Sequence, residues 1–237
     1  MFKRSVLSLM LVSSLLACSA NADQTAIKKT LAAQFPGAEI SSITKTPYAG
    51  LYEVLIDGQI IYTDETAAYV FLGSVVDTKA KKNITNERMA KLNEVKFDNL
   101  PFENAIKYVK GDGSRKLAIF SDPECPFCKK LEQELTKVDN VTIYIFPYPI
   151  AGLHPQATAA SKAIWCAPDR NAAWQDALLK GVLPKNDGKC KNPVDANVAY
   201  GNKLRISGTP TLIFSNGQRV PGMVPADKLE KLLDASK

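Results

Sequence analysis

Apolar residues follow two different spacings in the first part of the chain. Between residues 23 and 35 they recur four positions apart, which predicts a short amphipathic helix that the following Pro-Gly should end. From residue 39 to 76 the pattern is that of strands, with runs 51–56 and 60–63 flanking an Asp-Gly turn and a further apolar run at 69–76. We expect a small α+β unit, and a unit of about 60 residues is marginally stable alone.

Residues 83–100 are polar and charged, with three apolar residues at helical spacing on one face. Thr85 stands where a helix cap is needed, and Pro101 should stop the helix. We predict a partly solvated linker helix over the whole segment.

The remainder of the chain, residues 101–237, alternates strand and helix patterns. In chain order we predict strand 116–120, helix 126–138, strand 141–146, helices 154–166, 170–179 and 194–204, strand 211–214, a hairpin turn at Asn216-Gly217 and a last helix 226–233. This order is typical of a thioredoxin-like α/β domain with a helical insertion. The fold class is therefore α/β (α+β), with the small unit at the N-terminus.

The first 22 residues have the features of a secretory signal peptide. Two basic residues precede an apolar stretch, and Ala20-Asn21-Ala22 is a small-residue cleavage pattern, so cleavage is expected after Ala22. The alternative is a lipoprotein signal that would leave Cys18 as a lipidated N-terminus; the alanine site favours cleavage. No later stretch reaches the roughly 18 to 20 apolar residues that a membrane helix needs.

Composition and charge narrow the function classes. The chain has 46% hydrophobic and 23% charged residues, as ordinary globular proteins do. A net charge of +6, spread along the chain, is too mild to indicate a nucleic-acid partner.

Four cysteines follow the signal peptide: Cys125, Cys128, Cys166 and Cys190. An even number in an exported chain suggests pairing, with three connectivities possible on paper. If the adjacent Cys125 and Cys128 form one pair, Cys166 and Cys190 form a structural disulfide. Such a bond would contribute roughly 3 to 4 kcal/mol in the chain-entropy model.

The close pair Cys125 and Cys128 is best explained by redox chemistry. A zinc site needs four ligands, and this chain offers one close cysteine pair and a single histidine, so we expect no metal. A purely structural bond across two residues closes almost no loop and would stabilise little. We expect no cofactor either, since thiol exchange needs none.

The position of the pair at a helix start suggests a role for each cysteine. Cys125 directly precedes the helix, and Pro126 suits the first helical position. Free backbone N–H groups and the helix dipole favour an anion there, so the pKa of Cys125 should fall below about 8.5 and its thiolate should be the nucleophile. Cys128 lies one turn deeper and would be the resolving thiol.

Four stretches carry a resemblance to a known family: FSDPECPFCKKL, AIWCA, SGTPT and SNGQRVPG. They resemble the DsbC/DsbG family of bacterial periplasmic thiol:disulfide interchange proteins, and the DsbC members more closely. The resemblance implies a catalytic thioredoxin-like domain at 101–237, a linker helix at 83–100 and an N-terminal dimerisation domain at 23–82. It also implies a periplasmic homodimer with isomerase and chaperone activity, kept reduced by the membrane protein DsbD.

The resemblance also assigns a role to Thr209 and Pro210. In thioredoxin-like proteins the corresponding proline is cis beside the reactive cysteine, and the backbone there binds the substrate peptide.

The chain departs from the family pattern at two places. Pro126-Phe127 stands where close family members commonly have Gly-Tyr. Ile119 occupies the place of the buried acid of thioredoxins, so the proton acceptor for Cys128 is unassigned.

The function predicted from the sequence is isomerisation of wrong disulfides in misfolded secreted proteins. One alternative is a DsbG-like reductase of sulfenic acids on single cysteines, and another is a chaperone with incidental cysteines. A monomeric DsbA-like oxidase is a third alternative, but it would leave the N-terminal unit without a purpose.

Three further residues are given structural roles. The single histidine, His154, has no partner motif and is interpreted as a surface cap, and Trp165 and Trp174 are interpreted as core residues.

Overall fold

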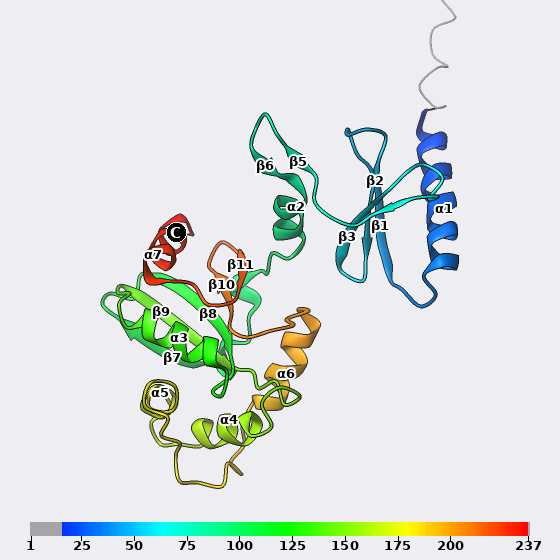
Figure 1. The fold of residues 1–237 in the computed structure, drawn as a ribbon. Helices are drawn as coiled ribbons and strands as arrows, with labels where there is room; N and C mark the ends of the chain where they lie inside the picture. Colours follow the sequence, from blue (N-terminus) through cyan, green and yellow to red (C-terminus); the bar gives the residue numbers. More distant parts are fainter. Residues whose placement is uncertain (1–15, 237) are drawn as a thin grey trace, which may run out of the picture. The chain divides into compact units, whose positions relative to one another are not determined.

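The structure is a computed structural model that describes residues 16–236, and the chain divides into two compact units between residues 89 and 90 (Figure 1). Each unit contains both helix and sheet, as the sequence predicted. The signal-peptide prediction for 1–22 falls mostly outside the described residues. Among those residues we find no helix with the length and hydrophobicity of a bilayer span.

The first unit packs one helix, α1 (Leu16–Gln34), on an antiparallel sheet. The sheet order is β1-β2-β3-β4, and its strands are β1 (Ile40–Lys45), β2 (Tyr52–Ile56), β3 (Gln59–Thr63) and β4 (Val70–Phe71). Ile27 and Leu31, one helical turn apart on α1, are fully buried in the core that Val54 and its neighbours form. The helix begins before residue 23, the start expected from the sequence, because the preceding segment is rich in alanine, the best helix former.

The apolar run 69–76 does not form the single strand that its hydrophobicity suggested. It contributes the two-residue strands β4 and β5 (Val76–Asp77), and β5 pairs with β6 (Lys82–Asn83) in a separate ribbon. Gly73, at φ +151°, separates β4 from β5 in a conformation that other residues rarely adopt. The run leaves large apolar side chains exposed: Tyr69, Phe71, Leu72 and Val76.

The linker helix is shorter than predicted: α2 covers only Ile84–Leu92. Val95 and Phe97 are both buried in the core of the second unit. Residues two apart point about 200° apart on a helix, so one helix could not bury both against the same core. The chain therefore leaves the helix and continues through the short 3-10 turns η1 (Phe97–Asn99) and η2 (Phe102–Asn104).

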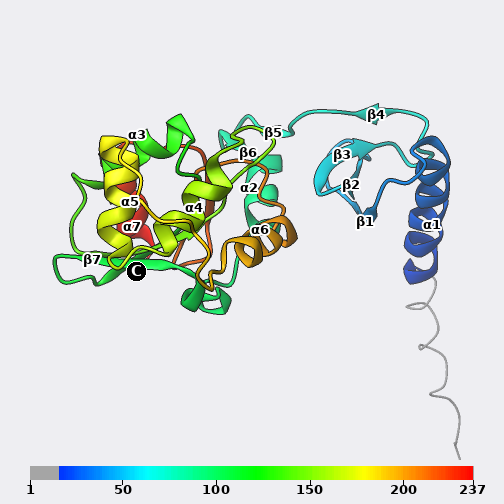
Figure 2. The ribbon, with the colours of Figure 1, turned by 90° about the horizontal axis from the view of Figure 1, so that it is seen from below.

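The second unit is built on a five-stranded sheet in the order β11-β10-β8-β9-β7 (Figure 1). Figure 2 shows the same unit from below, with the strand β7. The strands are β7 (Ile106–Lys110), β8 (Arg115–Ser121), β9 (Val141–Pro147), β10 (Thr211–Phe214) and β11 (Arg219–Pro221). The neighbours β8 and β9 are parallel, and the other pairs are antiparallel. The sequence prediction missed β7, whose short run of alternating apolar and polar residues occupies an edge.

Helices cover both faces of this sheet. They are α3 (Pro126–Leu135), α4 (Ala157–Trp165), α5 (Arg170–Gln175) with its π-helical continuation η3 (Asp176–Lys180), α6 (Val194–Lys203) and α7 (Ala226–Ala235). Successive residues of β8 alternate between two cores: Ile119 faces α3, η3 and α7, whereas Phe120 faces the segment 95–102 and α6. Trp165 and Trp174 are buried, as predicted.

Candidate active site

The sheet register brings two distant segments together where β8 ends and β10 begins. In the antiparallel pair β8 and β10, Phe120 lies opposite Thr211, so the chain leaving β8 runs beside the chain entering β10. The first of these segments leads to Cys125 and Cys128, and the second contains the Thr209–Pro210 peptide bond, which is cis. The predicted reactive and peptide-binding residues therefore lie side by side.

Cys125 occupies the N-cap position of α3, in an extended conformation, and Pro126 follows at the first helical position. The cysteine is reduced and only 5% exposed. Its sulfur lies 3.3 Å from the Thr209 carbonyl oxygen, to which the protonated form of the cysteine donates its S–H.

The pKa of Cys125 is lowered to about 5. The main cause is the hydrogen bond from the Cys128 thiol, and hydrogen bonds from the Thr209 side chain and from the N–H groups of Cys128 and Phe127 act in the same direction against the effect of burial. At neutral pH this sulfur is therefore a thiolate, which is the reactive form in thiol exchange.

Cys128 has the opposite chemistry. It is 1% exposed, and burial is the first cause that raises its pKa, with the neighbouring Cys125 adding to the effect. The backbone N–H of Asp122 donates to its sulfur at 3.4 Å. Cys128 therefore holds a proton while Cys125 carries the charge.

The two remaining cysteines are joined: Cys166 and Cys190 form a disulfide with an S–S distance of 2.01 Å. Cys166 directly follows α4, and Cys190 belongs to the loop that leads to α6. The bond therefore ties together the helical insertion and is separate from the reactive pair.

The interpretation of His154 as a surface cap was wrong. Its Nδ1 lies 3.0 Å from Oδ2 of Asp122, a carboxylate that is completely buried. Asp122 was not singled out from the sequence, because the two residues are 32 positions apart and only the fold brings them together. The one local signal is the placement of an acid one residue after the strand that leads to Cys125, and it marks Asp122 alone.

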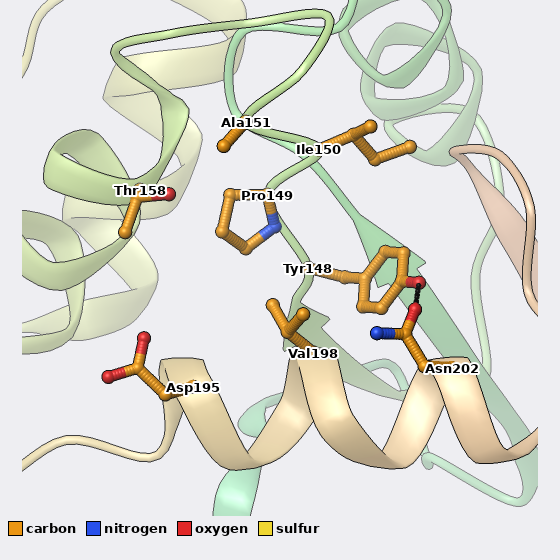
Figure 3. A pocket seen from close by; sticks show the side chains of 8 residues that line it. All are labelled: Tyr148, Pro149, Ile150, Ala151, Thr158, Asp195, Val198 and Asn202. Carbon is orange, nitrogen blue, oxygen red and sulfur yellow. Dashed lines mark hydrogen bonds between the residues drawn. The ribbon is translucent and has the colours of Figure 1, made fainter.

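A pocket of about 360 Å³ lies next to this region (Figure 3). Its walls come from the loop after β9, from α4 and from α6, with the lining residues Tyr148, Pro149, Ile150, Ala151, Thr158, Asp195, Val198 and Asn202. The Tyr148 hydroxyl donates to Oδ1 of Asn202 at 2.8 Å and also lies 3.0 Å from the Ile206 carbonyl oxygen. These contacts fix the loop after β9 against the insertion.

Within the described range, no cluster of three or more His, Cys, Asp or Glu side chains could hold a metal ion.

Two family descriptions match the chain. Residues 18–86 match the disulfide bond isomerase protein N-terminal domain, and residues 102–237 match a thioredoxin-like domain. The chain therefore has an N-terminal domain of disulfide isomerases followed by a thioredoxin-like domain with a reduced Cys-Pro-Phe-Cys pair. This combination defines a thiol:disulfide oxidoreductase.

Named relatives identify the family more closely. The chain is 42% identical over 208 residues to the probable thiol:disulfide interchange protein DsbC of Bordetella pertussis. The aligned region covers 88% of this chain and 73% of the relative. It is 32% identical over 221 residues to DsbC of Escherichia coli K12, covering 91% and 89%. This protein belongs to the DsbC family of thiol:disulfide interchange proteins.

A solved structure agrees with this assignment. The disulfide interchange protein from Neisseria gonorrhoeae superposes with a TM-score of 0.56 at 44% identity, over 58% of this chain and 98% of that one.

Proposed function

We propose that this protein rearranges wrong disulfides in exported proteins, with Cys125 as the nucleophile and Cys128 as the resolving thiol. The observation that carries the proposal is the lowered pKa of Cys125 beside a cysteine whose pKa is raised. An ionised outer thiol attacks foreign disulfides at neutral pH, and a protonated inner thiol leaves the captured intermediate in place until it is deprotonated.

The exchange has two possible outcomes after a common first step. The Cys125 thiolate attacks one sulfur of a substrate disulfide, forms a mixed disulfide and releases the other substrate sulfur as a thiolate. If a substrate thiolate then attacks the mixed disulfide, Cys125 is regenerated and the substrate is isomerised. If Cys128 loses its proton and attacks instead, the substrate leaves reduced, and Cys125 and Cys128 remain as a disulfide that an external dithiol must reduce.

Thr209 and Pro210 are proposed to align the substrate chain. Support comes from the Thr209 carbonyl oxygen, which lies 3.3 Å from the Cys125 sulfur. An extended peptide that hydrogen-bonds to this backbone segment would place its own disulfide next to Cys125, in the manner of strand addition.

We also propose that the protein is a homodimer formed through its N-terminal unit. The edge strand β4 pairs only with β3 among the described strands, and large apolar side chains at and after it are exposed, at 51% for Phe71 and 81% for Leu72. An unpaired edge with exposed apolar residues invites pairing with another strand. Two copies would present two reactive sites to one unfolded chain, which supports chaperone activity.

Periplasmic localisation follows from the proposed signal peptide, residues 1–22, cleaved after Ala22. Lipidation at Cys18 is the alternative that the cleavage pattern disfavours. In an oxidising compartment the reactive pair must be re-reduced, and we propose the membrane protein DsbD as the reductant.

Reactivation of scrambled ribonuclease A by the wild type and two variants tests the proposal. Cys125→Ser should abolish reactivation but retain suppression of aggregation, because only the nucleophile is lost. Cys128→Ser should accumulate mixed disulfides that are visible as shifted bands on non-reducing gels. Full isomerase activity in Cys125→Ser would refute the proposal, and reduction of a protein sulfenic acid without ribonuclease reactivation would favour the DsbG-like activity.

A further inference from the structure

The segment between β8 and α3 is organised around one buried residue, Asp122. Its backbone reaches both cysteines: its N–H donates to Cys128 Sγ at 3.4 Å, and its carbonyl oxygen accepts the N–H of Cys125 at 3.2 Å. A change in the contacts of the Asp122 side chain is therefore felt directly by the reactive pair.

The Asp122 carboxylate joins three parts of the chain. Oδ1 accepts the N–H of Glu124 at 2.9 Å, Oδ2 accepts the N–H of Ile150 at 2.8 Å, and His154 Nδ1 lies 3.0 Å from the same Oδ2. Burying a carboxylate is costly unless hydrogen bonds compensate, and here these partners supply them. The imidazole is consequently fixed in place while the His154 side chain remains 22% exposed.

Charge links His154 to the reactive cysteine. The pKa of His154 is raised, first by its hydrogen bond to Asp122, and then by the charges of Asp122, Cys125 and Glu124, against the effect of partial burial. These three ionisable groups all belong to the segment between β8 and α3. Coupling between two titrating groups is reciprocal, so a thiolate that favours the imidazolium is itself favoured by it.

We propose that Asp122 and His154 are positioning residues for the Cys125 thiolate: the buried carboxylate holds a cationic imidazole beside the reactive loop, and this cation stabilises the reduced pair. The inference rests on the proposed role of Cys125 as nucleophile. It adds no covalent step, since the exchange reaction keeps the same bonds, electrons and protons. Its consequence is that the redox equilibrium depends on the protonation of His154 as well as on that of the thiols.

The coupling can be measured without any substitution, because the chain has one histidine. The imidazole ring protons of the untagged protein, followed by NMR against pH, report His154 alone. We expect a higher His154 pKa in the reduced protein than in the protein with Cys125 and Cys128 oxidised, because oxidation removes the thiolate. Equal values in the two redox states would overturn the proposal.

A substitution tests the reverse direction. His154→Asn keeps a hydrogen-bond donor for Asp122 but removes the cation. We expect the Cys125 pKa, measured by thiolate absorbance at 240 nm, to rise by about half a unit or more, which is roughly a threefold loss in the ionisation constant. The pair should also become more reducing against glutathione at pH 6. A stabilised reduced form makes a pair more oxidising, and the variant loses part of that stabilisation.

The pH dependence separates an electrostatic role from a merely structural one. The difference in reduction potential between wild type and His154→Asn should shrink as pH rises through the His154 pKa, because the wild type then loses its cation as well. Lys189→Asn, an equal change in net charge at a side chain that is 84% exposed, is the matched control and should behave as wild type. A shift that is the same at all pH values, or no shift, would overturn the inference.

These results are distinguishable from failure of the proposed function. If Cys125 of the wild type titrates like a free thiol, the proposed function itself fails. If the wild-type Cys125 titrates with a pKa near 5 and His154→Asn leaves that pKa unchanged, only the proposed role of Asp122 and His154 fails.

Discussion

At the scale of single residues, Cys125 and Cys128 show how position changes the chemistry of one residue type. The two thiols are three positions apart, yet the pKa of Cys125 falls and that of Cys128 rises. The Cys125 sulfur accepts a hydrogen bond from the Cys128 thiol, which is the main cause, and it also lies at the helix end, where free N–H groups favour negative charge within the first turn. Cys128 is one turn deeper, where burial dominates.

Alkylation of the reduced protein should follow this difference. We expect the labelling rate of Cys125 by iodoacetamide to be half-maximal near pH 5, against about 8.5 for a free thiol, because the thiolate is the reacting species. Cys128 should remain unlabelled in the native protein. Peptide mapping by mass spectrometry after pulses at different pH values distinguishes the two sites, and a half-maximum near 8 for Cys125 would contradict the assignment.

The same shift predicts how stability depends on pH. A thiol whose folded-state pKa is lowered stabilises the fold above its unfolded pKa, and this contribution is lost as pH falls through the folded value. The reduced protein should therefore lose stability relative to the oxidised protein between about pH 8 and pH 5. Urea unfolding of both forms across this range measures the effect, and parallel curves would argue against it.

At the scale of elements, the sequence predicted strongly patterned segments well and weakly patterned ones poorly. The β-branched strand at 141–147 and the helix after Cys125 were found because periodicity dominates there. The edge strand β7 was missed because its run is short and half polar. The linker helix was overextended because burial of Phe97, a tertiary effect, decides where it ends.

The residues of the candidate site divide in the same way, into those with a local sequence signal and those without one. Cys125 and Cys128 could be found from sequence because their spacing and the following proline are local features. The contact between Asp122 and His154 could not be found, since it forms only when the loop after β9 is brought against the end of β8.

Gly201 in α6 provides a test of packing against propensity. A Cβ at this position would lie 2.3 Å from the Tyr148 ring, which is 4% exposed and held by hydrogen bonds through its hydroxyl. Helix propensity alone would favour Gly201→Ala by about 1 kcal/mol. Overpacking costs about 1 to 3 kcal/mol, so we expect net destabilisation, measured as a lower urea midpoint.

A control for this substitution is Gly152→Ala in the loop after β9. No atom lies within 4 Å of the Cβ that it would add. It should therefore leave the midpoint nearly unchanged, whereas a more stable Gly201→Ala protein would show that the Tyr148 ring yields easily.

At the scale of the whole molecule, the exposed apolar residues of the N-terminal unit are expected to be covered by a second copy. Leu72→Asp places a charge on a side chain that is 81% exposed, so the monomer fold should be retained while pairing is lost. Mass measurement in solution should give two chains for the wild type and one for the variant. Leu183→Asp, an equally drastic change at an exposed loop position of the second unit, should leave the dimer intact; a monomeric wild type at micromolar concentration would exclude the dimer.

The enclosed position of Cys128 has a consequence for how long a client stays attached. An inner sulfur that keeps its hydrogen is slow to displace the captured chain, so the client's own free sulfur has time to compete for release. We therefore expect the burial of this one side chain to favour reshuffling of the client's disulfides over their simple reduction.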